Sequence, residues 1–296
     1  MNVFVNDRFA WNIIPPVPTI RQMVVKEEVN LNLGINSVRV EVIGVSGKKS
    51  DSEKTVIYDI ASARYYALVI AVEKYNDPAI TDLDKPVEDA SRFLKVIQEE
   101  YTFEPDQITF LKNPTKGDII GTLHNLRTVV TPSDNLLIYY AGHGYWDEEM
   151  QTGYWLPRDA RRDNPVDWLP NTDLTNYLNA LKTKHTLLIA DACFSGGIFK
   201  TRSAFNDVMS VEKLYRLKSR KALTSGNLTE VPDESAFVKY LIQLLEENNK
   251  EYLTAEDLYL SLRKPVENNS PNVPKYGVIQ NVGDEGGDFV FIRKQE

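Results

Sequence analysis

Hydrophobic and polar residues alternate along the first 62 residues of the chain, and many of the apolar residues are β-branched. Alternation with a period of two is typical of β-strands that bury one face. The stretch VNLNLGINSVRVEVIGVSGKKSDSEKTVIYDI predicts three short strands, joined by turns at Gly34-Ile35-Asn36 and Ser46-Gly47-Lys48. We therefore predict a β-rich segment over residues 1–62.

From Arg64 onward, continuous apolar runs alternate with segments of helical spacing. Short apolar runs bounded by turn residues predict buried parallel strands, whereas a period of 3.6 residues predicts amphipathic helices. The predicted strands are YYALVIAVEKY, DQITFLKN, DNLLIYYAGHG, HTLLIADACFSGG, SRKALTSG and GGDFVFIR. The predicted helices are DKPVEDASRFLKVIQEEY, TKGDIIGTLHNLRTVV (opened by Thr115), NTDLTNYLNALKT, SAFVKYLIQLLEEN and TAEDLYLSLRKPVEN. This order predicts an α/β fold whose mostly parallel sheet is covered by helices on both faces.

The change of pattern divides the chain into a β-rich segment, 1–62, and an α/β domain, 63–296. The first segment resembles the last strands of an immunoglobulin-like sandwich, with too few strands to close one. We interpret it as a β appendage, whole or truncated.

Composition predicts a soluble globular protein, with 42% hydrophobic and 26% charged residues. No stretch approaches the roughly 20 apolar residues of a membrane span, and the N-terminus has no basic region followed by an apolar one. A single cysteine excludes an internal disulfide framework and, with three histidines, leaves little for a zinc site. The net charge of −8 argues against nucleic acid as a partner. We expect a cytosolic protein with no membrane or metal.

Two predicted strands end in residues that suit nucleophilic catalysis: His143 in YYAGHG and Cys193 in LIADACFSGG. Sites in open α/β sheets form at the carboxyl ends of the strands. Because a thiol with a pKa of about 8.5 is mostly protonated at neutral pH, a reactive cysteine needs a neighbouring imidazole or another positive group. A lone cysteine is usually an inert core residue, but His143 lies 50 residues before Cys193, which leaves room for a helical crossover.

The motifs YYALVIAVEKY, PVEDA, IYYAGHG, GYWLP, LIADACFSGG, RKALTSG, DESAF and GGDFVF occur in that order. From about Arg64 to the C-terminus, the chain thus resembles the caspase-like cysteine peptidases, most closely their metacaspase and bacterial branch. The resemblance implies a mostly parallel sheet of about six strands with helices on both faces. It also implies that Cys193 is the nucleophile and His143 its base, with an oxyanion hole formed by the backbone N–H groups of Gly144 and Cys193.

The same resemblance bears on specificity, because Asp191 stands where classical caspases carry glutamine. Asp89, in PVEDA, matches an acidic position of metacaspases. Two carboxylates in one pocket suit a basic side chain, so we expect a peptide or protein substrate cleaved after Arg or Lys. Asp191 could instead accept hydrogen bonds from backbone amides, and Asp89 could complement the dipole of its helix.

A basic stretch, residues 200–221, falls where the family places a linker. By resemblance, a large-subunit-like part covers about 63–200, the linker about 200–219, and a small-subunit-like part about 220–296. Such a run is commonly a solvated face, but a protease specific for basic residues would find cleavage sites there. The candidates for self-cleavage are Lys213, Arg216, Lys218 and Arg220.

Two departures from the family pattern concern Phe194, where metacaspases usually have histidine, and calcium, for which no acidic run stands out. We expect no cofactor, and the sequence does not support calcium activation.

Structural roles are favoured for His124, His185 and Ser195, whereas Tyr154 and Trp155 could line the cleft or pack in the core. The main alternative function is an inactive caspase-like scaffold whose N-terminal β segment docks a protein partner. A different cysteine hydrolase or transferase is a third.

Overall fold

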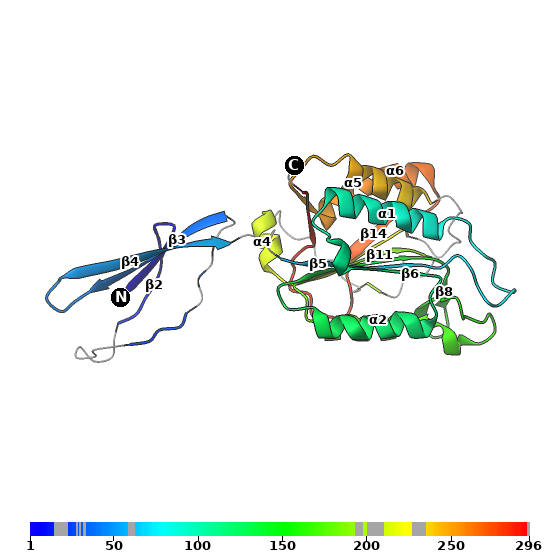
Figure 1. The fold of residues 1–296 in the computed structure, drawn as a ribbon, viewed down its shortest axis with the longest axis horizontal. Coiled ribbons are helices and arrows are strands. Elements are labelled where there is room, and N and C mark those ends of the chain that lie inside the picture. Colours follow the sequence, from blue (N-terminus) through cyan, green and yellow to red (C-terminus); the bar gives the residue numbers. More distant parts are fainter. Residues whose placement is uncertain are drawn as a thin grey trace. The chain divides into compact units, whose positions relative to one another are not determined.

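The computed structural model describes residues 1–14, 23–27, 29, 31, 34–58, 63–192, 198–199, 210–226 and 235–294. The chain divides into two compact units, Met1–Ser62 and Ala63–Glu296. Each unit has its own sheet (Figure 1).

The N-terminal unit contains a four-stranded antiparallel sheet with the order β2-β1-β3-β4. Its strands are β1 (Asn2–Val5), β2 (Arg8–Asn12), β3 (Gly34–Ile43) and β4 (Lys49–Tyr58). The predicted turn at Ser46-Gly47-Lys48 joins β3 to β4, and Gly47 takes the positive φ of +79° that the reversal needs. The predicted turn at Gly34-Ile35-Asn36 is wrong, because these residues begin β3. Asn36 is buried and its side chain accepts a hydrogen bond from Asn6, so this polar residue completes packing instead of turning the chain.

The second unit is built on a six-stranded sheet with the order β14-β12-β11-β7-β5-β6. Its strands are β5 (Tyr65–Ala71), β6 (Ile108–Lys112), β7 (Asn135–Ala141), β11 (His185–Asp191), β12 (Ser219–Thr224) and β14 (Lys275–Val278). All neighbours are parallel except β14, which runs antiparallel to β12. This arrangement confirms the predicted α/β fold with a mostly parallel sheet.

Helices cover both faces of this sheet (Figure 1). On one face lie α1 (Pro86–Glu100), α5 (Ala236–Glu246) and α6 (Ala255–Asn269); on the other lie α2 (Lys116–Val129) and α3 (Asn171–Ala180). The apolar residues of α2 and α3 share one buried cluster with alternate residues of the central strands, including Ile70, Ile138 and Leu188. The intervening strand residues face the other helices, as the stacking of Tyr139 on Phe93 of α1 illustrates, with ring centroids 4.7 Å apart.

The C-terminal part of this unit differs from the expectation in its pairing. GGDFVFIR supplies β15 (Val290–Ile292), which pairs with β13 (Tyr252–Thr254) in a separate two-stranded sheet. The sixth strand of the large sheet is β14, which the sequence pattern did not indicate. A further small sheet consists of β8 (Gly144–Asp147), β9 (Thr152–Trp155) and β10 (Leu169–Pro170).

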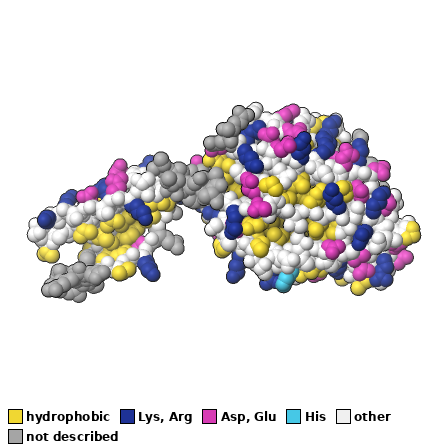
Figure 2. All heavy atoms as spheres, in the orientation of Figure 1, with side chains coloured by type: hydrophobic (Ala, Val, Ile, Leu, Met, Phe, Trp, Pro, Cys, Tyr) yellow, Lys and Arg dark blue, Asp and Glu magenta, His cyan; other side chains and the backbone are white. Residues whose placement is uncertain are grey.

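Charged side chains of both signs are interspersed over the visible face of the second unit, with hydrophobic side chains between them (Figure 2). The N-terminal sheet exposes several large apolar side chains, among them Phe9, Val42 and Ile43. Within the described ranges, no helix combines the length and apolar character needed to cross a membrane.

Candidate active site

Two neighbouring strands of the large sheet end beside the predicted catalytic residues. β7 and β11 run parallel, and Asp191 at the end of β11 stands opposite Ala141 at the end of β7. His143 follows Ala141 by two positions, and Cys193 follows Asp191 by two positions. Cys193 lies outside the described residues. Each predicted catalytic residue therefore follows, by two positions, one member of the Ala141–Asp191 pair that closes the two strands.

Close packing at Gly142 and two hydrogen bonds at His143 fix the backbone that carries the imidazole. Gly142 has a φ of +156°, and a Cβ atom there would lie 3.0 Å from the Tyr140 hydroxyl and 3.2 Å from Val72. Only glycine therefore fits without displacing its neighbours. The His143 N–H donates to the Tyr75 hydroxyl at 2.9 Å, and the His143 carbonyl accepts from the Tyr140 hydroxyl at 2.7 Å. These contacts fix the position from which the imidazole projects.

The imidazole of His143 has one ring nitrogen engaged. Its Nε2 lies 2.8 Å from the backbone carbonyl oxygen of Thr81, and the Tyr75 ring packs beside it with centroids 5.1 Å apart. Because a carbonyl can only accept, the proton of the neutral ring belongs on Nε2, which leaves Nδ1 with a lone pair. His143 is therefore oriented to accept a proton at Nδ1 while Thr81 holds the other side of the ring.

Gly144, the predicted oxyanion donor, begins β8 and stands opposite Trp155 of β9. The Leu156 N–H donates to the His143 carbonyl at 3.1 Å, which makes His143 and Leu156 the preceding hydrogen-bonded pair. Since such pairs alternate along an antiparallel ladder, the Gly144 N–H points away from β9. It is thus directed outside the small sheet rather than into it.

Asp191 is a buried carboxyl group with an unpaired oxygen. The residue is 5% exposed, and within the described structure its Oδ1 has no hydrogen-bond partner. Burial raises the pKa of Asp191 to about 6, while hydrogen bonds from the Ser235 and Ser225 hydroxyls act in the opposite direction. A buried carboxylate oxygen of this kind is costly unless a donor or cation completes it.

Asp89, the second predicted acidic residue, acts electrostatically on Asp191. It occupies the first turn of α1, where its side chain is 15% exposed and 3.7 Å from the Arg92 guanidinium. Its negative charge contributes to the raised pKa of Asp191. Both carboxylates also raise the pKa of buried Tyr139, after the larger effect of burial itself. The structure therefore brings the two predicted acidic residues into one electrostatic environment.

The four candidate self-cleavage residues have different surroundings. Lys213 is exposed in α4 (Val211–Arg216), Arg216 ends that helix, and Lys218 precedes β12. The prediction of Arg220 as a cleavage site is wrong, because this residue lies within β12 and is fully buried. Its guanidinium donates to the backbone carbonyls of Leu181, Thr183, Lys184 and Ser219. A strand inside a sheet cannot enter a protease cleft, so the accessible linker ends before Ser219. Residues 200–209 lie outside the described ranges.

The remaining residues named from the sequence differ in their burial. His124 is exposed on α2, whereas His185 is buried and bonded to Ser219 Oγ at 2.9 Å and the Tyr215 carbonyl at 3.0 Å. Trp155 is fully buried against Tyr140, with centroids 4.1 Å apart, which favours the core interpretation. Tyr154 packs on Trp168. Phe194 and Ser195 lie outside the described residues.

Three residues near the site were not singled out from the sequence: Thr81, Ser225 and Ser235. Thr81 contributes a backbone carbonyl, which every residue type has, so no sequence signal marks it. Ser225 and Ser235 lie in the motifs RKALTSG and DESAF, where a signal existed without an assigned role. Across the described ranges, no cluster of three or more His, Cys, Asp or Glu side chains could hold a metal ion.

Comparisons with known proteins give one family and one fold. The sequence model of the caspase domain matches residues 64–283. Among solved structures, a caspase-1 from Spodoptera frugiperda superimposes with a TM-score of 0.53 at 16% identity, covering 73% of this chain and 87% of that chain. At this level of identity the superposition demonstrates a shared fold. The comparison with curated protein sequences gave no match.

Proposed function

The chain belongs to the caspase domain family of cysteine peptidases, and on that premise we propose that it is an endopeptidase that cleaves after Arg or Lys. Cys193 is the nucleophile and His143 is its base. Asp191 and Asp89 recognise the basic side chain of the substrate. The resemblance to metacaspases in sequence supports the same assignment.

Catalysis begins with proton transfer from the Cys193 thiol to Nδ1 of His143. The hydrogen bond from Nε2 to Thr81 supports this role, because it leaves Nδ1 as the basic nitrogen. The thiolate attacks the carbonyl carbon of the scissile peptide bond and forms a tetrahedral intermediate. Its oxyanion accepts hydrogen bonds from the backbone N–H groups of Gly144 and Cys193.

Collapse of the intermediate breaks the C–N bond and leaves an acyl-enzyme on Cys193. The proton on Nδ1 passes to the departing amine, which leaves as the first product. His143 then removes a proton from a water molecule, whose oxygen attacks the thioester carbonyl. This second step releases the new carboxyl terminus and returns the thiol.

The observation that carries the specificity is the buried, unpaired Oδ1 of Asp191 with Asp89 nearby. A guanidinium or ammonium group would supply the missing hydrogen-bond donor and neutralise the charge. Arg would donate through two nitrogens, whereas Lys would act as a point charge, so Arg is the preferred residue. A substrate aspartate would meet like charge and be rejected.

Fluorogenic peptides that differ only at the residue before the cleaved bond test this function. Arg and Lys peptides should be cleaved, and their uncharged citrulline counterpart and the Asp peptide should be cleaved poorly. Cys193→Ala and His143→Ala should each lower kcat/KM by at least about a thousandfold. His124→Ala, which alters an exposed histidine on α2, is the matched control and should keep full activity.

Two outcomes would contradict the proposal. Absence of turnover on every peptide, with the protein folded, would favour the inactive scaffold. Cleavage after Asp in preference to Arg would refute the acidic pocket.

We further propose self-processing at Lys213, Arg216 or Lys218. These residues lie in or beside the short helix α4, on which Lys213 is exposed. Purified wild type should yield fragments whose new C-termini, located by mass spectrometry, end at one of the three residues. Cys193→Ala should remain intact. A wild-type chain that stays whole during expression and prolonged incubation would contradict self-processing without affecting the peptide assay.

A further inference from the structure

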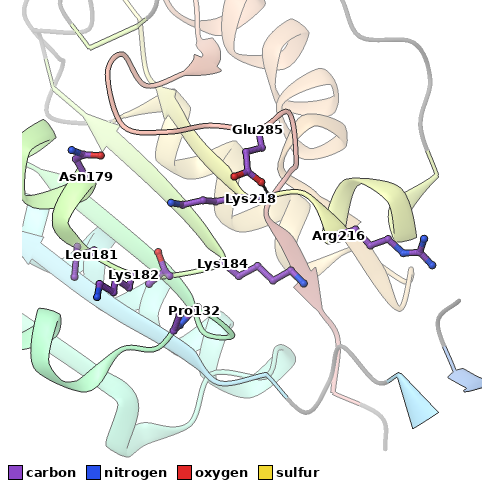
Figure 3. A pocket seen from close by; sticks show the side chains of 9 residues that line it. Pro132, Asn179, Leu181, Lys182, Lys184, Arg216, Lys218 and Glu285 are labelled. Atoms are coloured by element: carbon purple, nitrogen blue, oxygen red, sulfur yellow. Dashed lines mark hydrogen bonds between the residues drawn. The ribbon is translucent and has the colours of Figure 1, made fainter. Parts of the chain in front are cut away.

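A cavity of about 360 Å³ lies at the amino ends of β11 and β12, at the opposite edge of the sheet from His143 and Asp191. Four cationic side chains line it, against a single carboxylate (Figure 3). The cations are Lys182, Lys184, Arg216 and Lys218, and the carboxylate is Glu285. Since β11 spans seven residues, the cavity is about 20 Å from the candidate catalytic groups.

The cations of this cavity are not balanced by the carboxylate. Within the described ranges, no carboxylate lies within ion-pair distance of Lys182, Arg216 or Lys218, and Glu285 accepts a bond from the Lys218 backbone N–H at 3.4 Å. Figure 3 shows Lys218 extending toward Asn179, with Lys182 nearby, whereas the Arg216 guanidinium points away. Lys182 and Lys218 are therefore the cations best placed to meet one ligand.

The wall behind the cavity carries a further positive charge. The guanidinium of buried Arg220 donates to the carbonyls of Leu181 and Thr183 at 3.1 and 2.9 Å. These acceptors are neutral, so they hold the segment rigid without cancelling the charge. Burial lowers the pKa of Arg220 to about 10, although the carboxylates of Asp284 and Glu285 oppose this effect. Arg220 therefore places a buried positive charge behind the cavity, with the carboxylates of Asp284 and Glu285 also close to it.

His185, the first residue of β11, is affected by two of these cations. Burial lowers its pKa to about 3, with further lowering from the charges of Lys184 and Arg220, while the bond to the Tyr215 carbonyl opposes it. Only the contributions of Lys184 and Arg220 reflect positive potential, because burial, the largest cause, disfavours charge of either sign.

We propose that this cavity binds a small polyanion, a molecule that carries two or more linked phosphate groups, through Lys182 and Lys218. Asn179 adds a neutral amide donor on the same side. The concave shape and limited volume suit a small molecule better than a protein segment. Binding there needs none of the candidate catalytic groups, because the cavity lies at the other edge of the sheet.

The test uses the full chain with Cys193→Ala, which prevents self-processing and makes the measurement independent of activity. Isothermal titration with sodium tripolyphosphate, at fixed ionic strength, should give saturable binding with one site. Lys182→Gln with Lys218→Gln should raise the dissociation constant at least about tenfold. The single variants Lys182→Gln and Lys218→Gln are each compared with Lys213→Gln, which removes one charge from an exposed residue of α4 outside the cavity and should leave the constant unchanged.

Parallel titrations with ATP and adenosine distinguish two sources of the phosphate chain. Equal affinity for tripolyphosphate and ATP, with none for adenosine, identifies the phosphates as the recognised group. Tighter binding of ATP together with measurable binding of adenosine identifies a nucleotide. Absence of tripolyphosphate binding at millimolar concentration would overturn the proposal. Equal weakening by Lys213→Gln, or binding only of an acidic peptide, would do the same.

Discussion

The protonation state of the buried Asp191 carboxyl group determines whether it attracts a cationic substrate side chain. Its pKa is raised to about 6, mainly by burial and in part by the charge of Asp89. Above that pH the carboxyl group is ionised and attracts a guanidinium. Below it the group is neutral, and the attraction is lost.

A pH series on paired substrates should reveal this titration. The ratio of kcat/KM for an Arg peptide to that for its citrulline counterpart cancels the protonation of the catalytic pair, since both substrates need it. The ratio should rise by up to about tenfold per pH unit below the pKa of Asp191 and level off above it. Steady-state assays between about pH 5 and pH 8 measure it.

Two variants sharpen the pH experiment. Asp191→Asn should remove the pH dependence of the ratio and lower its plateau by about a hundredfold. Asp89→Asn removes a charge that raises the pKa of Asp191, so the rise should shift to lower pH while the dependence persists. A ratio that stays flat in the wild type would show that Asp191 does not contact the substrate side chain.

Predictability from sequence varies among these site residues. Cys193 and His143 could be predicted from a local pattern, a thiol and an imidazole at glycine-rich strand ends. Asp191 and Asp89 required the family resemblance, and the structure then placed them in one environment. Thr81 could not be found, because its contribution depends on loop shape and a backbone atom.

Helix α2 owes its start to a capping box. Thr115 Oγ1 accepts from the Asp118 N–H at 3.2 Å, and Asp118 accepts from the Thr115 N–H at 2.9 Å. Thr115→Ala should lower the free energy of unfolding by about 1 kcal/mol, measured by urea denaturation. Thr115→Ser should retain most of it, and Thr122→Ala, inside the same helix, should be near neutral. Equal effects of the two alanine variants would contradict a capping role.

Element prediction succeeded where the periodic pattern was long and local. The strands β5, β7 and β11 have continuous apolar centres because helices cover both faces of the sheet. β14 was missed because KYGV is a short, partly exposed edge strand whose pairing with β12 joins distant residues. β15 was recognised as a strand, but its partner β13 is also distant in sequence. Alternation identifies a strand without identifying its neighbour.

At the scale of the molecule, every described residue of the candidate site belongs to the unit Ala63–Glu296, which has its own core. A chain of residues 63–296 should therefore fold alone and keep kcat/KM for the Arg peptide within about twofold of the full chain. Circular dichroism and the peptide assay measure the two properties. A folded fragment with greatly reduced kcat/KM would assign the first 62 residues a part in catalysis.

Arg220 and its strand have a consequence for the quaternary state of a processed chain. β12 pairs with β11 from His185–Ser219 to Ala190–Thr224. The Arg220 guanidinium also donates to carbonyls of Leu181 and Thr183, which precede α4 in the chain. A cut after Lys213, Arg216 or Lys218 would therefore break one peptide bond without separating the pieces. The product would be a heterodimer of two chains that share one sheet and one core, and only unfolding would part them.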